Sequence, residues 1–221
     1  MDKHDAGTGA FASAAMPVAE LAFCSELEAT PTARVPDLAD DVVRPAYLAH
    51  IVFLTNRIDD MRQWWRAVLG GAAMMSGKEM EFITFDDEHH RVAIFRRDRL
   101  KEKSAAADTT GMHHVAFTYG SLADLVATYR RLKARGIVPV RTIHHGITVS
   151  NYYLDPDNNR VELQVNAFAT KDKLNAWLAL RGFNDNPIGV LFDFAELADR
   201  LDAGEDPEIL HQPLAAAAEP A

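Results

Sequence analysis

Met112-His113-His114-Val115-Ala116-Phe117 repeats a pattern that first occurs as Leu48-Ala49-His50-Ile51-Val52-Phe53. The histidines His50 and His114 directly precede the apolar part of each stretch. Each copy closes on an Arg-Val pair, within His90-Arg91-Val92-Ala93-Ile94 and Asn159-Arg160-Val161-Glu162-Leu163. Superposing the two pairs places Ala93 opposite Glu162. The chain therefore contains an internal repeat in which only the second copy keeps a carboxylate at this position.

Each copy of the repeat predicts the same order of elements, βαβββ. In the first copy the apolar run 47–54 indicates a strand, and Ile58, Met61, Trp65 and Val68 follow at helical spacing. In the second copy 113–119 indicates the strand, with a helix beginning near Ser121 and closing at Gly136. The remaining expected strands are 72–76, 81–85 and 91–95 in the first copy and 138–143, 149–154 and 160–165 in the second.

The fold class expected from this pattern is α+β, with two tandem βαβββ modules forming a curved mixed sheet around a metal site. A helical C-terminal extension follows, with helices expected over 171–181 and 194–201. The expected division is a flexible N-terminal arm (1–44), a first module (45–97), a linker (98–111), a second module (112–167), the extension (168–212) and a disordered tail (213–221).

Composition excludes several classes of partner. The chain has 221 residues, 48% of them hydrophobic, which is enough for a substantial core. Its net charge of −9 and its lack of a dense Lys/Arg run argue against nucleic acid and against an anionic membrane surface. Cys24 is the only cysteine, so a reducing, cytoplasmic compartment is expected. No apolar stretch is long enough to span a membrane.

Alternation along the strands places the polar candidates on one face. His114 shares a face with Ala116, and Glu162 shares a face with Gln164, whereas Leu163 points to the opposite, apolar face. A single strand histidine is more often a hydrogen-bonded residue than a metal ligand. Three candidates at superposable positions of two modules favour a shared ligand set, and two imidazoles with one carboxylate and vacant positions suit ferrous iron and oxygen chemistry.

The combination of these motifs with the turn Asp155-Pro156-Asp157-Asn158-Asn159 resembles the vicinal oxygen chelate superfamily. Within it, the chain is similar to the type I extradiol ring-cleavage dioxygenases, in their small single-domain form that acts on catechols or biphenyl-diols. The resemblance covers roughly residues 46–166. It implies a non-haem Fe(II) enzyme, with Mn(II) as an alternative metal, that opens an aromatic ring next to a vicinal diol using O2. A small aromatic diol and O2 are the implied partners, and paired modules of this kind predict a homo-oligomer.

The resemblance also implies roles for individual residues. It gives His50, His114 and Glu162 as the metal ligands, and it gives His90, His145 and Tyr152 as catalytic residues around the metal. Glyoxalase-like members use a fourth ligand at the position that Ala93 occupies here, and a methyl group cannot coordinate a metal. Loss of this ligand leaves room for a bidentate substrate and dioxygen.

Several candidates stand next to a residue of similar chemistry. Only one of two adjacent strand residues can face the site, so His89 and His144 are interpreted as surface residues and Tyr153 as a core residue. The choice between Tyr152 and Tyr153 stays open on spacing alone. Aromatic residues are available to line a pocket, although such residues more often pack in a core: Trp64, Trp65, Phe82, Phe168, Trp177 and Phe192.

Two alternative functions remain open from the sequence. A metal-dependent isomerase, epimerase or lyase of the glyoxalase-like type would use the metal only to polarise an enediolate. A non-enzymatic binding protein of the resistance type would sequester a small molecule, but such proteins lack the metal triad. The extension either closes over a site or forms an oligomer contact, and the sequence does not choose between them.

Overall fold

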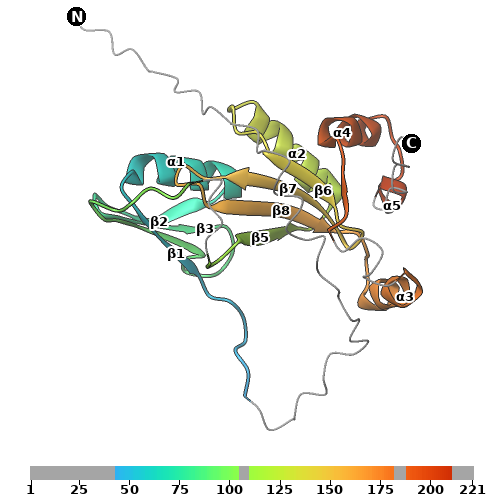
Figure 1. Cartoon of the computed structure of the whole chain (residues 1–221), viewed down its shortest axis with the longest axis horizontal. Helices are drawn as coiled ribbons and strands as arrows, with labels where there is room; N and C mark the ends of the chain where they lie inside the picture. Colours follow the sequence, from blue (N-terminus) through green and yellow to red (C-terminus); the bar gives the residue numbers. More distant parts are fainter. Residues whose placement is uncertain (1–42, 105–109, 182–187, 211–221) are drawn as a thin grey trace, which may run out of the picture.

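The computed structural model describes residues 43–104, 110–181 and 188–210, and Figure 1 shows their arrangement. Most of the expected N-terminal arm (1–44) and the whole expected tail (213–221) lie outside the described residues. Within the described ranges, no helix combines the length and apolar character needed to cross a bilayer.

The first module has the expected βαβββ order. Its elements are β1 (Ile51–Thr55), α1 (Ile58–Leu69), β2 (Ala72–Ser76), β3 (Met80–Thr84) and β4 (Val92–Arg96). They form a four-stranded sheet in the order β1-β4-β3-β2, with β1 parallel to β4 and the other pairs antiparallel. Gly70, in the left-handed conformation with φ of 63°, ends α1 as a glycine C-cap.

The second module repeats this order and adds a strand from the extension. Its elements are β5 (His114–Tyr119), α2 (Leu122–Lys133), β6 (Arg141–His144), β7 (Thr148–Leu154) and β8 (Arg160–Asn166). The sheet order is β5-β8-β7-β6-β9, in which β9 (Val190–Leu191) pairs antiparallel with β6. The expected α+β fold of two βαβββ modules is confirmed, while the division of the chain into domains stays a prediction.

The extension contains α3 (Lys171–Arg181), α4 (Phe194–Asp202) and α5 (Pro207–Leu210). Both helices expected there are present, whereas β9 and α5 were not predicted. The side chain of Asp193 accepts a hydrogen bond from the backbone N–H of Ala195 and caps α4. In Figure 1, α4 lies close to α2, and Phe194 at the start of α4 contacts the Tyr129 ring of α2 edge to face.

One continuous hydrophobic core joins the two modules under α1 and α2. Trp65 of α1 is fully buried, and its ring contacts Phe117 of β5 in a T-shaped arrangement with 6.1 Å between centroids. Its indole N–H donates to Asp155 Oδ2 at 3.2 Å, in the turn between β7 and β8. Truncating a buried tryptophan typically costs about 3–5 kcal/mol, so Trp65 is a main attachment between the modules. Trp64 is also buried in this core.

Candidate functional site

The sheet of the second module brings one histidine and one carboxylate together. In the parallel pairing of β5 and β8, Ala116 lies opposite Glu162, so His114 is two residues before the partner of Glu162. Side chains two residues apart share a face, and His114 Nε2 lies 3.0 Å from Glu162 Oε2. The first module has the same register, with Val52, two residues after His50, opposite Ala93. The superposition of Ala93 on Glu162 made from the Arg-Val pairs is therefore correct.

Glu162 is a buried carboxylate, with 4% of its surface exposed. Burial alone raises the pKa of the carboxyl group, but hydrogen bonds from His114, Ser150 and Tyr152 outweigh it, so the pKa is lowered overall. The carboxylate is thus held ionised. Ser150 is fully buried on β7, two residues before Tyr152, and sequence reasoning missed it because a serine in a strand carries no specific signal.

His145 and Tyr152 lie against the same carboxylate. Tyr152 is opposite Glu162 in the β7–β8 pairing, and its hydroxyl oxygen is 2.9 Å from His145 Nε2. His145 Nε2 is also 3.9 Å from Glu162 Oε1. Burial lowers the pKa of His145, although the charge of Glu162 opposes this shift, and burial together with Glu162 raises the pKa of Tyr152 above its usual range. We call His114, His145, Tyr152 and Glu162 the Glu162 cluster.

The first module carries a second cluster of rings. His50 stacks on His90 with 4.4 Å between ring centroids, and His90 stacks on Phe82 at 4.4 Å with an interplanar angle of 11°. Phe82 is opposite Ala93 in the β3–β4 pairing, as Tyr152 is opposite Glu162 in the second module. Burial lowers the pKa of His90, and the neighbouring His50 lowers it further. We call His50, His90 and Phe82 the His50 cluster.

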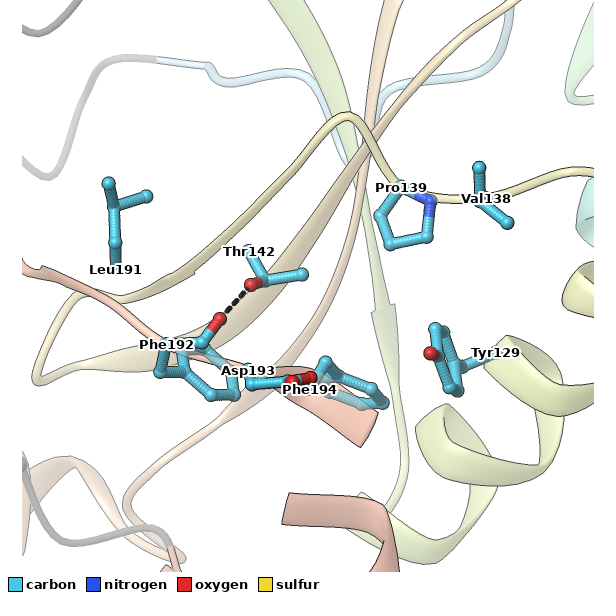
Figure 2. Close-up of a pocket in the computed structure, with 8 residues that line it drawn as sticks. All are labelled: Tyr129, Val138, Pro139, Thr142, Leu191, Phe192, Asp193 and Phe194. Carbon is cyan, nitrogen blue, oxygen red and sulfur yellow. Dashed lines mark hydrogen bonds between the residues drawn. The ribbon is translucent and has the colours of Figure 1, made fainter. Parts of the chain in front are cut away.

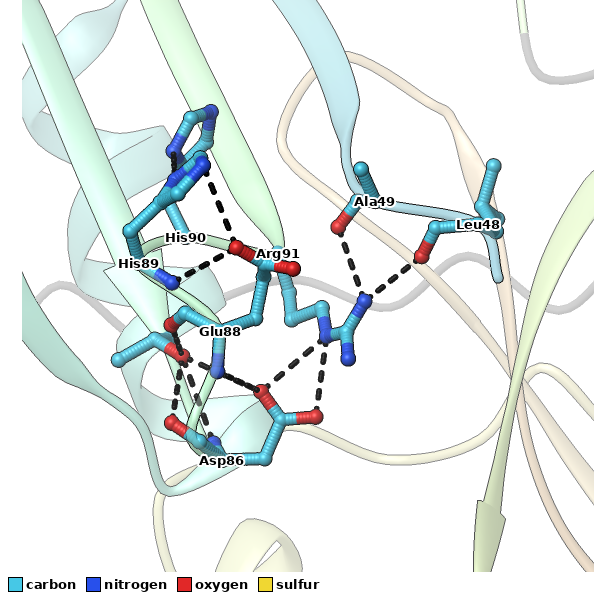
Figure 3. Close-up of polar contacts among 8 residues, drawn as sticks. Leu48, Ala49, Asp86, Glu88, His89, His90 and Arg91 are labelled. Carbon is cyan, nitrogen blue, oxygen red and sulfur yellow. Dashed lines mark hydrogen bonds and ion pairs between the residues drawn. The ribbon is translucent and has the colours of Figure 1, made fainter. Parts of the chain in front are cut away.

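Arg91 holds the chain that leads into His50. Its guanidinium Nη1 donates to the carbonyl oxygens of Leu48 at 2.7 Å and Ala49 at 3.1 Å, while Nε donates to both carboxylate oxygens of Asp86 (Figure 3). The equivalent Arg160 of the second module contacts His113 beside His114. The repeated Arg-Val pair marked these two positions in the sequence, although its role in holding the segment before each histidine was not recognised.

The neighbours of the candidates have other surroundings. His89 is exposed, as expected, and it contacts Glu88. Tyr153 lies in the hydrophobic core, as expected, with its hydroxyl buried. The interpretation of His144 as a surface residue is wrong: it is 2% exposed, and its Nδ1 accepts the backbone N–H of Gly146 at 3.1 Å. His144 points away from the face that carries Tyr152, and packing of the extension against that opposite face buries it.

The donor set fits a divalent cation, but it is divided between the two clusters. Adjacent ligands of an octahedral ion at about 2.1 Å lie about 3 Å apart, which is the separation of His114 Nε2 and Glu162 Oε2. Across residues 43–104, 110–181 and 188–210, no three or more His, Cys, Asp or Glu side chains are grouped so as to hold a metal ion. His114 and Glu162 therefore bring together two of the three expected ligands, and His50 lies with His90 instead.

A separate pocket of about 520 Å³ lies on the other face of the second sheet, between α2, β6 and the start of α4 (Figure 2). Its lining is mostly apolar: Tyr129, Val138, Pro139, Thr142, Leu191, Phe192, Asp193 and Phe194. Thr142 is opposite Asn151 in the β6–β7 pairing and Tyr152 is the next residue, so Thr142 and Tyr152 face opposite sides. The pocket is therefore distinct from the Glu162 cluster.

Comparison with known proteins identifies the family of the chain. Residues 47–163 match the model of the Glyoxalase/Bleomycin resistance protein/Dioxygenase superfamily. The chain belongs to this superfamily. Biphenyl-2,3-diol 1,2-dioxygenase 2 of Rhodococcus globerulus is 43% identical over 157 residues, which cover 71% of this chain and 82% of the relative. Biphenyl-2,3-diol 1,2-dioxygenase 3 of the same organism is 40% identical over 159 residues, covering 71% and 83%.

Solved structures match part of the chain. A glyoxylase/bleomycin resistance protein/dioxygenase domain from Frankia sp. EAN1pec matches with a TM-score of 0.46 and 16% identity, covering 56% of this chain and 99% of that chain. The fosfomycin resistance protein FosX from Listeria monocytogenes, in its hexagonal crystal form, matches with a TM-score of 0.44 and 18% identity, covering 59% and 98%.

Proposed function

We propose that this protein is a non-haem Fe(II)-dependent extradiol dioxygenase, which cleaves the ring of a catechol-type substrate next to the vicinal diol and incorporates both atoms of O2. The observation that carries the proposal is the Glu162 cluster, in which an ionised carboxylate, a histidine at ligand distance, a second imidazole and a tyrosine hydroxyl converge. The two Rhodococcus globerulus relatives, named as biphenyl-2,3-diol 1,2-dioxygenases, support the substrate class.

His50, His114 and Glu162 are the proposed ligands of the metal. Fe(II) and Mn(II) both accept two imidazoles and a carboxylate, so the choice of Fe(II) rests on the family resemblance. When bound, the ion supplies a Lewis acid for the two diol oxygens and a route for electrons to dioxygen. The lowered pKa of Glu162 keeps this ligand ionised at neutral pH.

His145 and Tyr152 are proposed to handle the protons of the diol. Burial lowers the pKa of His145, so the imidazole is neutral near pH 7 and is able to accept a proton from a substrate hydroxyl. The raised pKa of Tyr152 keeps its hydroxyl protonated and able to donate a hydrogen bond. His90, which stacks on the proposed ligand His50, is the proposed hydrogen-bond donor to dioxygen.

The position of His50 adds a requirement to the proposal. Since His50 stacks on His90 and lies outside the Glu162 cluster, it has to reach His114 and Glu162 either by movement within its own chain or from a second copy. The homo-oligomer expected from the sequence fits the second route. We propose that the protein is cytoplasmic and that it has no nucleic-acid or membrane partner.

Mixing two inactive variants separates these routes. His50→Ala and His114→Ala chains, unfolded and refolded together, regain about a quarter of wild-type activity if sites of a two-fold dimer combine residues from both chains. They stay inactive if each site is built from one chain.

Anaerobic reconstitution with Fe(II), followed by oxygen-electrode measurements on a panel of catechols, tests the function. Oxygen uptake with a yellow ring-fission product is expected from the wild type, and His114→Ala is expected to abolish it. Turnover without oxygen would support the isomerase, epimerase or lyase alternative. Tight binding of a small molecule without consumption and without metal would support the resistance-type alternative.

A further inference from the structure

The C-terminal extension places an aromatic ring on the turn that carries His145. Gly146, the next residue, has φ of +82°, and a Cβ built there would lie 2.6 Å and 2.9 Å from two atoms of the Trp177 ring of α3. Only a residue without a side chain leaves room for this ring. Phe168, which follows β8, contacts the same ring at 5.6 Å between centroids. Trp177 therefore packs against the backbone directly beside His145.

This turn lies at one end of the Glu162 cluster. Tyr152 of β7 and Glu162 of β8 are partners in the strand pairing, and they share one face of the sheet. The backbone N–H of His145 donates to the Thr148 carbonyl oxygen at 2.9 Å and closes the turn between β6 and β7. From this turn the imidazole reaches back to the Tyr152 hydroxyl oxygen, 2.9 Å from Nε2. Trp177 thus lies just beyond the cluster, on the side of the turn.

The chemistry of the cluster differs from that of the ring beside it. The side chains of the cluster are polar or ionisable, so they suit the two oxygens of a diol, and they offer little apolar surface to the rest of a substrate. Trp177 is only partly buried, whereas Trp64 and Trp65 are 2% and 0% exposed. Part of the Trp177 ring is therefore accessible to a ligand, and an aromatic ring is suited to contact an aromatic or alkyl group.

We propose that Trp177 is a specificity-determining residue, whose ring contacts the substituent of a ring-substituted diol bound at the Glu162 cluster and does not contact an unsubstituted catechol. This inference rests on the proposed function for the position of the diol, although the contact itself requires no turnover. If Trp177 had only the structural role of supporting the turn of His145, its loss would affect every diol equally.

A thermodynamic cycle separates the contact from a structural effect. One side of the cycle is Trp177→Ala, and the other is the replacement of biphenyl-2,3-diol by catechol, which lacks the phenyl group. Dissociation constants are measured by calorimetric titration of the full-length, Fe(II)-loaded protein without oxygen, so that no ring is cleaved. Trp177→Ala is expected to weaken binding of biphenyl-2,3-diol about 10–100-fold, because an aromatic contact and its buried area are worth about that much in affinity. Binding of catechol is expected to change less than about 2-fold.

Each other outcome decides against the inference or against the function. Equal weakening for both diols would show that the ring only supports the turn, and unchanged binding of both would show that it makes no contact; either result would overturn the inference. If neither diol binds the wild type, the proposed function and the inference fail together. Binding that depends on both Trp177 and the phenyl group, without oxygen uptake under air, would refute the proposed function alone.

Control variants test whether the effect belongs to this ring. Trp177→Phe keeps an aromatic ring and is expected to bind biphenyl-2,3-diol within about 5-fold of the wild type. Leu191→Ala removes a half-exposed apolar side chain of the same extension, which lines the pocket on the other face, and is expected to leave both dissociation constants unchanged. A Leu191→Ala protein with the phenotype of Trp177→Ala would overturn the assignment. If Trp177→Ala does not fold, Trp177→Leu, which keeps an apolar side chain against Gly146, completes the same cycle.

Discussion

Replacing Glu162 by glutamine separates a ligand role from a structural one. The amide keeps the size of the side chain and one acceptor oxygen, but it removes the charge that His114, Ser150 and Tyr152 stabilise. Hydrogen bonds to charged groups exceed those to neutral groups by roughly 1 kcal/mol, so the metal-free variant is expected to lose about that much free energy of unfolding. This loss is the same whether or not the residue binds a metal.

The effect of added metal is the decisive quantity. A ligand present at 100 times its Kd stabilises the folded state by about 2.7 kcal/mol. In a chain of this size that corresponds to a rise in Tm of about 5–11 °C. Loss of residues that only support a metal ligand weakens binding by about 10–100-fold, so loss of a ligand itself is expected to weaken it by about 100-fold or more. At the same metal concentration, the stabilisation of Glu162→Gln then falls to about 0.4 kcal/mol or less.

Differential scanning calorimetry with and without Mn(II), and with Fe(II) under anaerobic conditions, measures this difference. Glu205→Gln is a suitable control, because it removes a carboxylate that pairs with Arg200 outside the Glu162 cluster. The control is expected to keep the full metal-dependent rise in Tm. A Glu162→Gln protein that keeps the same rise would show that this carboxylate is not a ligand and would refute the reasoning about the cluster.

Three further outcomes are expected. Tyr152→Phe removes a hydroxyl that lies beside His145 and hydrogen-bonds Glu162, so it should lower kcat about 10–100-fold in oxygen uptake and weaken metal binding by about 10–100-fold. Burial raises the pKa of Asp155 to about 6, so its contribution to stability is complete below about pH 4 and is lost as the pH rises through about 6. Urea unfolding of the wild type should therefore show a loss of about 3 kcal/mol in the free energy of unfolding over this pH range. Asp155→Asn should lack this loss. Arg91→Met removes the bonds that hold the segment before His50 and should weaken metal binding, measured by calorimetric titration, about 10–100-fold.

The equivalence of positions in the two copies was predictable because both copies close on an Arg-Val pair. Two Arg-Val pairs placed Ala93 and Glu162 at equivalent positions, and the β1–β4 and β5–β8 pairings have this register. Once the register is known, the face on which His114 lies follows from a period of two. The fold was therefore accessible from the repeat, whereas the pairing of His114 with Glu162 was implied by the family resemblance.

The contacts made by the extension were not accessible in this way. Strand β9 has only two residues, which is too short for a periodic pattern, and the close approach of Gly189 to the His144–Gly146 turn is a tertiary contact. His144 was misjudged for the same reason, since the extension buries it. The position of His50 beside His90 also depends on how side chains pack within the first module, on which a repeat gives no information.

The two sheets differ in how their outer edges are covered, and this difference affects self-association. Strand β9 covers the outer hydrogen-bonding groups of β6, whereas β2 is exposed along its whole length and carries Met74 and Met75 on its surface. An uncovered outer strand is a template for adding a strand from another molecule. The irregular register between Ala73 and Met75 interrupts the ladder there and makes such addition less favourable. Straightening this bulge by deleting one residue should therefore promote aggregation through the first module and leave the second module unaffected.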